Sequence, residues 1–147
     1  MSLRVLFVCT GNSARSQMAE SVLNRRGAGR YEAESAGSHP AAHVHPVAVE
    51  VLREAGLGWS GRQPRGLDEV ERERWDLVIT VCDQAKEACP VFLGRPVFEH
   101  WGMPDPAAVE GDAATRRAAF VETLALINRR VDDLLLRSGS LPVQTER

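Results

Sequence analysis

A short apolar run leads directly into a loop and then into a helix, and this order constrains the fold more than any other feature of the chain. Residues 5–8 are all apolar, which is typical of a buried strand. Residues 16–23 carry Met18, Val22 and Leu23 at the spacing of a core-facing helix stripe. A strand, a tight loop and a helix in succession predict an α/β unit with parallel strands.

The loop between this strand and this helix joins a cysteine to an arginine six positions later. Backbone N–H groups in such a loop, at a helix N-terminus, form a binding site for an anion. Arg15 adds a planar two-pronged donor that suits a tetrahedral oxyanion. The same environment is expected to lower the pKa of Cys9, so that more of this residue is present as the thiolate. The predicted oxyanion-binding residues are Thr10, Gly11, Asn12, Ser13, Ala14, Arg15 and Ser16.

Two residues of the loop have expected structural roles. Gly11 is expected to supply a positive φ angle, and Asn12 to brace the loop through its side chain. The plainer interpretation is a cysteine that ends a buried strand before an ordinary turn. It leaves unexplained the arginine and the serine hydroxyls that could bind a thiolate.

The rest of the chain alternates between strand and helix patterns. Expected strands are 5–8, 31–37, 77–81 and 96–101, and expected helices are 16–26, 46–55, 67–75, 83–88 and 113–137. The apolar strand 77–81 is expected near the centre of the sheet. The predicted fold class is α/β, with three layers in which helices flank a four-stranded parallel sheet. We expect one domain over residues 1–137 and a polar tail over 138–147.

Composition excludes several classes of function. The chain has 147 residues, of which 44% are hydrophobic and 26% charged, with a net charge of −2. No general basic surface favours nucleic acid or anionic membranes. No apolar run approaches the roughly 20 residues of a membrane span. We expect a monomeric cytoplasmic protein, whose three cysteines are reduced at rest.

Further candidate residues follow the later strands, and parallel strands share one carboxyl edge. Cys82 follows strand 77–81, and Cys89 lies seven positions on, between a polar segment and Pro90. Two buried apolar thiols are the alternative interpretation, which suits Cys82 better than Cys89. Asp105 stands between two prolines in a rigid turn, where it could protonate a leaving oxygen. Aspartate is also common in surface turns.

Residues 9–16 resemble the Cys-x5-Arg loop of the low-molecular-weight tyrosine phosphatases. The longer run Cys-Thr-Gly-Asn-Ser-Ala-Arg-Ser-Gln-Met-Ala-Glu is similar to thioredoxin-coupled arsenate reductases, which share that fold. Thr-Val-Cys-Asp-Gln-Ala-Lys-Glu-Ala-Cys-Pro resembles the redox segment of these reductases, and Glu-His-Trp-Gly…Asp-Pro-Ala their acid loop. That acid loop usually has a second acid where this chain has Pro104, so the proton is assigned to Asp105.

The resemblance implies a mechanism and the partners it needs. Cys9 attacks arsenate held by Arg15 and the loop amides, Ser16 assists the thiolate, and Asp105 protonates the leaving oxygen. A Cys9–Cys82 disulfide forms, Cys89 converts it to Cys82–Cys89, and thioredoxin reduces it without a cofactor. Two alternatives stay open: a phosphatase in which water replaces Cys82, and an oxyanion sensor without turnover.

Metal binding is not expected. Asn12, Glu20 and Ser35 match positions that bind potassium in some of these reductases, but Arg65 stands near the place of the expected acidic ligand. A loop with three histidines has no cysteine or carboxylate at ligand spacing. These histidines are His39, His43 and His45.

Overall fold

The computed structural model describes residues 2–90 and 92–137. Four strands, four helices and two short 3-10 turns make up this part of the chain. The strands are β1 Leu3–Cys9, β2 Tyr31–Gly37, β3 Leu77–Thr80 and β4 Val97–His100. The helices are α1 Arg15–Arg26, α2 Pro46–Glu54, α3 Asp83–Ala88 and α4 Ala113–Leu136, and the 3-10 turns are η1 Leu67–Glu69 and η2 Pro106–Ala108.

The four strands form one parallel sheet in the order β2-β1-β3-β4. Register pairs Cys9 with Gly37, Val8 with Thr80, and Thr80 with His100. The carboxyl ends of all four strands therefore lie at one edge of the sheet. The predicted α/β class and four-stranded parallel sheet are confirmed, and β3 lies centrally beside β1.

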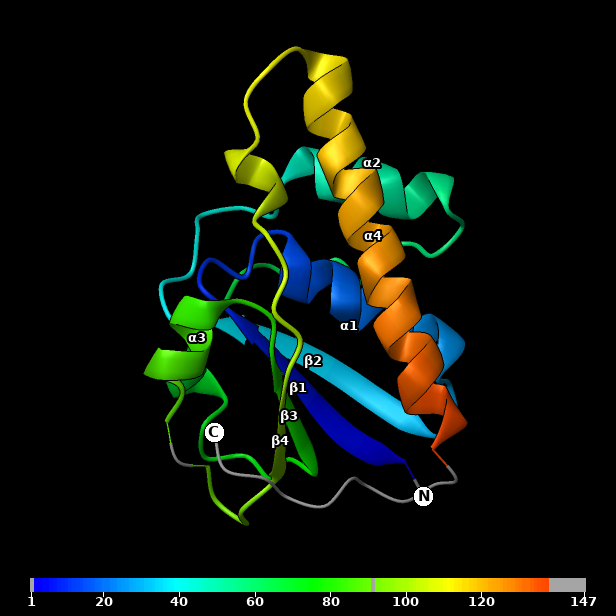
Figure 1. The fold of residues 1–147 in the computed structure, drawn as a ribbon. Helices are drawn as coiled ribbons and strands as arrows, with labels where there is room; N and C mark the ends of the chain where they lie inside the picture. Colours follow the sequence, from blue (N-terminus) through cyan, green and yellow to red (C-terminus); the bar gives the residue numbers. More distant parts are fainter. Residues whose placement is uncertain (1, 91, 138–147) are drawn as a thin grey trace.

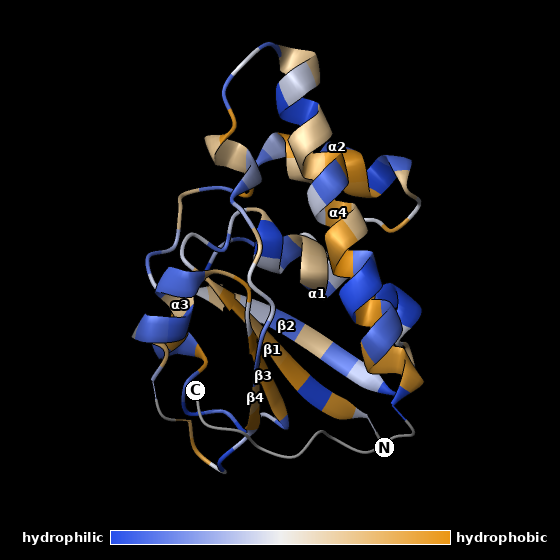
Figure 2. Ribbon diagram, viewed as in Figure 1, coloured by the Kyte–Doolittle hydropathy of each residue, from blue (hydrophilic) through white to orange (hydrophobic). Residues whose placement is uncertain are grey.

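Helices lie on both sides of the sheet. Figure 1 shows α1 and α4 packed together over one face, with α2 beside α4 and α3 on the other side. The central strands carry the most apolar colouring in Figure 2, whereas α3 is hydrophilic over most of its surface. The central strands are buried between these helices, and the loops that follow them emerge at the carboxyl edge of the sheet. The largest fully buried side chains include Phe7, Met18, Ile79 and Trp101.

The expected helix over residues 67–75 is wrong. Only η1 forms there, and the chain then turns, so that Trp75 is buried and its indole nitrogen donates to the Val70 carbonyl at 3.0 Å. Arg4 stacks over the Trp75 ring, 4.2 Å from its centroid. Burial of Val70 and Trp75 against the sheet overrides a charge pattern that would suit a solvated helix, because helix propensity is a weak preference.

Other expected elements are present with shifts at their ends. Strand 77–81 ends at Thr80, strand 96–101 covers Val97–His100, and the final helix ends at Leu136. The predicted tail, 138–147, lies outside the described residues. Among residues 2–90 and 92–137, no helix is long and apolar enough to span a membrane.

Candidate active site

The loop after β1 is held from outside by the segment that follows β2. Four loop carbonyls accept backbone hydrogen bonds of 2.8–3.0 Å from this segment. Because the carbonyls point outward to these donors, the N–H groups of the loop are left for the pocket, as an anion site requires. The pairs are Ser38 with Cys9, His39 with Thr10, Ala41 with Gly11, and His45 with Ser13.

Asn12 takes the left-handed conformation that was expected of Gly11. Its φ is 51°, whereas Gly11 is not among the glycines with positive φ. Asparagine tolerates this region because its short polar side chain can bond locally. The Asn12 amide is fully buried: Oδ1 accepts from the Arg65 backbone N–H at 3.0 Å, and Nδ2 donates to Ser16 Oγ at 2.8 Å.

Cys9 ends β1 and lies at the base of the loop. Its Sγ is 2.8 Å from Ser16 Oγ and accepts from the Asn12 backbone N–H at 3.1 Å. Burial raises the pKa of the Cys9 thiol above its ordinary value, although Ser16, Asn12 and the charge of Arg15 act to lower it. The expected lowering of this pKa is therefore wrong for the free protein, because desolvation outweighs the favourable contacts.

Gly37, the last residue of β2, packs directly against the loop. A Cβ at this position would lie 2.5 Å from the Thr10 carbonyl oxygen and 2.9 Å from the Asn12 nitrogen. Both distances are far below van der Waals contact, and both neighbours are backbone atoms. Only a residue without a side chain fits here, so β2 and the loop are shaped to each other.

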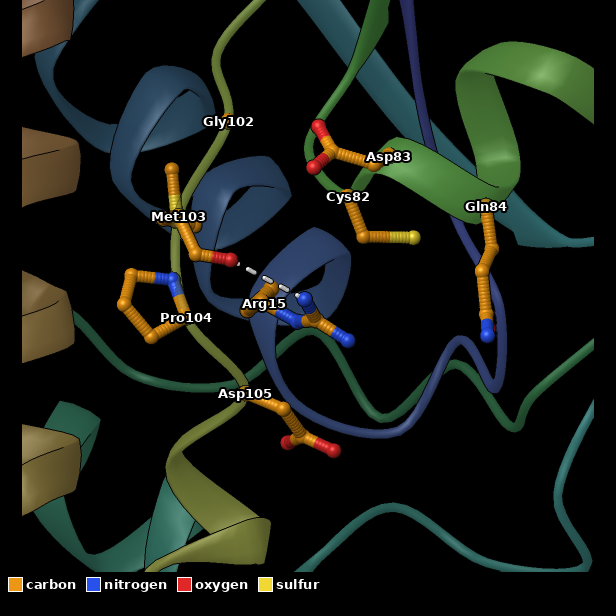
Figure 3. A pocket seen from close by; sticks show the side chains of 8 residues that line it. All are labelled: Arg15, Cys82, Asp83, Gln84, Gly102, Met103, Pro104 and Asp105. Carbon is orange, nitrogen blue, oxygen red and sulfur yellow. Dashed lines mark hydrogen bonds between the residues drawn. The ribbon is translucent and has the colours of Figure 1, made fainter.

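Arg15 begins α1 and connects the loop to the turn that carries the predicted acid Asp105, called here the acid turn (residues 102–105). Its Nη1 donates to the Met103 carbonyl at 3.1 Å, as Figure 3 shows. Asp105 follows in the same turn, exposed, and its Oδ1 accepts from the Ala107 N–H at 2.9 Å to cap η2. The guanidinium thus holds the turn that carries the predicted acid, while its other N–H groups stay available for an oxyanion.

Two adjoining pockets contain four of the five predicted catalytic residues. A cavity of about 280 Å³ is lined by Cys9 and loop residues, and one of about 670 Å³ is lined by Cys82 and the acid turn. Both are lined by Arg15, Asp105 and Gln84, so the two cavities share a wall. Figure 3 shows the side chains of the larger one.

Cys82 faces the anion loop, which is the predicted oxyanion-binding loop of residues 9–16. Its Sγ lies 3.2 Å from Thr10 Oγ1, the hydroxyl next to Cys9 in the chain. Cys82 is also the N-cap of α3, and its Sγ accepts from the Ala85 N–H at 3.4 Å. Cys89 is the C-cap of the same helix, half-buried, and does not line either cavity. The three cysteines, all within the described residues, are in the reduced form, without a disulfide between them.

Comparison with known proteins places the chain in a family. The model of the low molecular weight phosphotyrosine protein phosphatase family matches residues 4–145. The chain belongs to this family. An arsenate reductase of Bacillus licheniformis is 38% identical over 128 residues, 86% of this chain and 91% of that protein. A glutaredoxin arsenate reductase of Synechocystis sp. is 34% identical over 103 residues, 70% of this chain and 78% of that protein.

Solved structures of similar proteins agree with this assignment. An arsenate reductase from Archaeoglobus fulgidus has 35% identity and a TM-score of 0.67, over 87% of this chain and 98% of that one. A thioredoxin-dependent arsenate reductase of Corynebacterium glutamicum has 30% identity and a TM-score of 0.68, over 91% of this chain and 62% of that one. The resemblance to arsenate reductases of the phosphatase family is confirmed.

In this member of the phosphatase family, the residues considered for potassium are bonded to side chains of the protein. Glu20 is fully buried and accepts from Ser35 Oγ at 2.8 Å, Ser60 Oγ at 2.9 Å and Arg62 Nε at 3.4 Å. Arg65 Nε donates to the Ser35 carbonyl at 3.0 Å. Arginine therefore supplies the positive charge at this place.

The histidines serve the loops of this phosphatase-family member. His45 caps α2, where its Nδ1 accepts from the Val47 N–H at 3.2 Å, and its ring packs against Phe120. His39 contacts Ser38 Oγ at 3.2 Å. Across the described ranges, no group of three or more His, Cys, Asp or Glu side chains is placed to hold a metal ion.

Sequence reasoning missed several residues of the site. Gln84 lines both cavities, and its Oε1 accepts from Thr10 Oγ1 at 3.2 Å. A polar residue two positions after Cys82 was the available signal. His100 bonds Thr80 and Asp83 beside Cys82, and its place at the end of a strand could have indicated it. The segment after β2, residues 38–45, holds the loop through backbone hydrogen bonds, so its side chains gave no signal in the sequence.

Proposed function

We propose that this protein reduces arsenate to arsenite with three thiols, Cys9, Cys82 and Cys89, and takes the electrons from thioredoxin. The observation that carries this proposal is the place of Cys82, in the wall beside the anion loop and 3.2 Å from the Thr10 hydroxyl. A phosphatase needs one nucleophilic thiol. A second thiol next to it is what a two-electron reduction requires. The reductase names of its relatives support the same activity.

The first step forms a bond between Cys9 and arsenic. The loop N–H groups and Arg15 bind the oxyanion, and Cys9 attacks as the thiolate, held by Ser16 and Asn12. One arsenate oxygen leaves as water. It leaves from an arsenate hydroxyl, which already carries one proton, and takes the second proton from Asp105, which is held in the adjoining turn.

The second step transfers the electrons. The Cys82 thiolate attacks Cys9 Sγ, and the electron pair of the sulfur–arsenic bond stays with arsenic, which departs as arsenite. A Cys9–Cys82 disulfide remains. Cys89 then attacks Cys82 Sγ, which frees Cys9 as a thiolate and leaves a Cys82–Cys89 disulfide. Thioredoxin reduces this disulfide by the same exchange.

The last exchange demands a change in α3. Cys82 and Cys89 cap the two ends of this helix, and seven residues at about 1.5 Å each put their Cα atoms roughly 10 Å apart. A disulfide needs about 4.4–6.8 Å. The six-residue helix must therefore unwind. A helix this short has little stability of its own, which makes that change easy.

Several details of this function rest on the proposal alone. The relatives include a thioredoxin-dependent reductase and a glutaredoxin arsenate reductase, so a small dithiol protein is the partner class. Within this class we propose thioredoxin, the partner that the sequence resemblance implies for a Cys82–Cys89 disulfide. The protein is proposed to act as a cytoplasmic monomer, with one domain over residues 1–137, and to use no cofactor.

A phosphomonoester hydrolase is the second candidate function. Cys9, Arg15 and Asp105 would serve it equally well, with water in place of Cys82 as the second attacker, and the family model is named for phosphatases. None of the described residues that line the two cavities has an aromatic side chain that could stack on a phosphotyrosine ring. We therefore expect only weak hydrolysis of aryl phosphates.

One pair of assays decides between the two functions. The first measures arsenate-dependent oxidation of reduced thioredoxin, with reduced glutaredoxin in a parallel arm. The second measures hydrolysis of an aryl phosphate by the same preparation. Arsenate turnover above hydrolysis supports the reductase. Hydrolysis without any arsenate-dependent thiol oxidation would replace it with the phosphatase.

A further inference from the structure

His100 connects the two ends of the strand-to-helix junction that contains Cys82. Its Nδ1 lies 2.7 Å from Thr80 Oγ1, and its Nε2 lies 2.8 Å from Asp83 Oδ1. Thr80 is the last residue of β3 and Asp83 the first of α3. The imidazole therefore reaches across Cys82 from the end of β4, a neighbouring strand.

The hydrogen bonds of this group are satisfied in either protonation state of the ring. The carboxylate of Asp83 accepts from Nε2–H. In the neutral ring, Nδ1 accepts from the Thr80 hydroxyl. In the charged ring, Nδ1–H donates to Thr80 Oγ1, which can turn to the Glu99 carbonyl 3.5 Å away. The hydrogen bond between Asp83 and His100 therefore has a donor and an acceptor whether or not the ring is charged, although the Asp83 side chain is solvent-exposed.

A second observation concerns Gly102, which lies close to this pair. A Cβ at Gly102 would lie 3.0 Å from His100 Nε2 and 3.6 Å from Asp83 Oδ1. Figure 3 shows Gly102, Asp83 and Cys82 among the residues that line the larger cavity. Gly102 is the first residue of the acid turn. Because it has no side chain, it does not crowd the contact between His100 and Asp83 at the start of α3.

We propose that His100 is a positioning residue that stabilises helical α3 through Asp83 and so favours the dithiol form of Cys82 and Cys89. This inference rests on the proposed function, in which α3 must unwind for the two thiols to join. Unwinding removes Asp83 from its place at the helix start. The Asp83–His100 pair then opposes the Cys82–Cys89 disulfide and makes that disulfide easier for thioredoxin to reduce.

The test measures the Cys82–Cys89 equilibrium directly, in full-length protein with Cys9→Ser so that only two thiols exchange. The protein is equilibrated with reduced and oxidised glutathione, and the internal disulfide is quantified by mass. Asp83→Ala and His100→Ala should each shift the equilibrium towards the disulfide by about threefold, the scale of a solvent-exposed pair. Asp83→Asn, which keeps an acceptor oxygen, should stay within about 1.5-fold of the parent.

The double variant separates the pair from general weakening of the helix. Asp83→Ala with His100→Ala should shift the equilibrium no further than either change alone. Glu87→Ala, an exposed acid on the same helix, is the matched control and should leave it unchanged. Additive effects, an Asp83→Asn shift as large as that of Asp83→Ala, or no shift at all would each overturn the role of His100.

This experiment is independent of arsenate. A protein that forms the disulfide with the expected shifts but oxidises no thioredoxin in the presence of arsenate would contradict the proposed function and leave the Asp83–His100 pair in place. A parent protein that forms no Cys82–Cys89 disulfide in any glutathione ratio would contradict both.

Discussion

The side-chain amide of Asn12 donates to the hydroxyl of Ser16 at 2.8 Å, and this contact orients the nucleophile. The amide cannot be reversed, because its oxygen accepts from the Arg65 backbone N–H. With a lone pair of Ser16 Oγ used for Asn12, the Ser16 proton is free to point at Cys9 Sγ, 2.8 Å away. The arrangement supplies a donor to a thiolate at Cys9 before any substrate binds.

Cys9→Ser is expected to abolish both arsenate reduction and aryl-phosphate hydrolysis. A buried serine hydroxyl gives no comparable anion in this loop, so each turnover should fall by at least about 1,000-fold. The two assays described above measure this. Thermal unfolding should remain close to that of the parent, and turnover within tenfold of the parent would remove Cys9 from the nucleophile role.

Cys82→Ser is expected to separate the two activities. Arsenate turnover should fall by at least about 100-fold, because only the reduction needs a second sulfur, whereas aryl-phosphate hydrolysis should stay within about threefold. Cys89→Ser is the matched variant: it should permit one turnover and leave a Cys9–Cys82 disulfide, visible by mass. A parallel loss of both activities in Cys82→Ser would make Cys82 structural.

Ser16→Ala is expected to shift the reactivity of Cys9 to higher pH. Burial already raises the Cys9 pKa, and Ser16 opposes that increase, so its removal raises the pKa further. Less thiolate is then present at any pH below the pKa. Alkylation of Cys9 by iodoacetamide at pH 7 should slow by about threefold to tenfold, since one pKa unit is a factor of ten.

The control for this shift is the full pH profile of alkylation. At pH values well above the pKa, parent and Ser16→Ala should converge on similar rates, because both are then thiolates. Ser21→Ala removes a buried hydroxyl on the same helix that has no hydrogen-bond partner among the described residues, and this variant should follow the parent. A profile that moves to lower pH would show that Ser16 stabilises the thiol instead.

The redox change in α3 should be visible in amide exchange. Oxidised protein with the Cys82–Cys89 disulfide is expected to exchange faster across Asp83–Ala88 than reduced protein, because the helix has to unwind. The strands should show equal protection in both states. Equal protection across α3, with the disulfide confirmed by mass, would contradict the unwinding.

Potassium is expected to have no effect on this protein. The Glu20 carboxylate already accepts from Arg62, Ser35 and Ser60. Exchange of sodium for potassium should change neither Tm nor arsenate turnover. Arg62→Ala should lower stability by about 1–3 kcal/mol, since it takes a partner from a buried charge. The exposed Arg25→Ala serves as its control, and a potassium-dependent rise in the parent Tm would contradict the prediction.

The sequence alone was sufficient for the sheet and for the position of the loop. Apolar runs such as 5–8 and 77–81 mark central parallel strands, and strand ends place Cys9 and Cys82 together. It failed at residues 67–75, where burial of Trp75 outweighs the charge pattern. It also failed at the Cys9 pKa, because desolvation depends on neighbours that only the folded chain defines.

Gly37 has a consequence for how this chain can diverge. The residue has no functional group and contacts no substrate in the proposed reaction, yet a single methyl there would collide with two backbone atoms of the loop. Substitution of surface charges on α3 or α4 meets no such obstacle. Alanine at position 37 would require a different loop conformation, so backbone geometry rather than chemistry restricts this position to glycine.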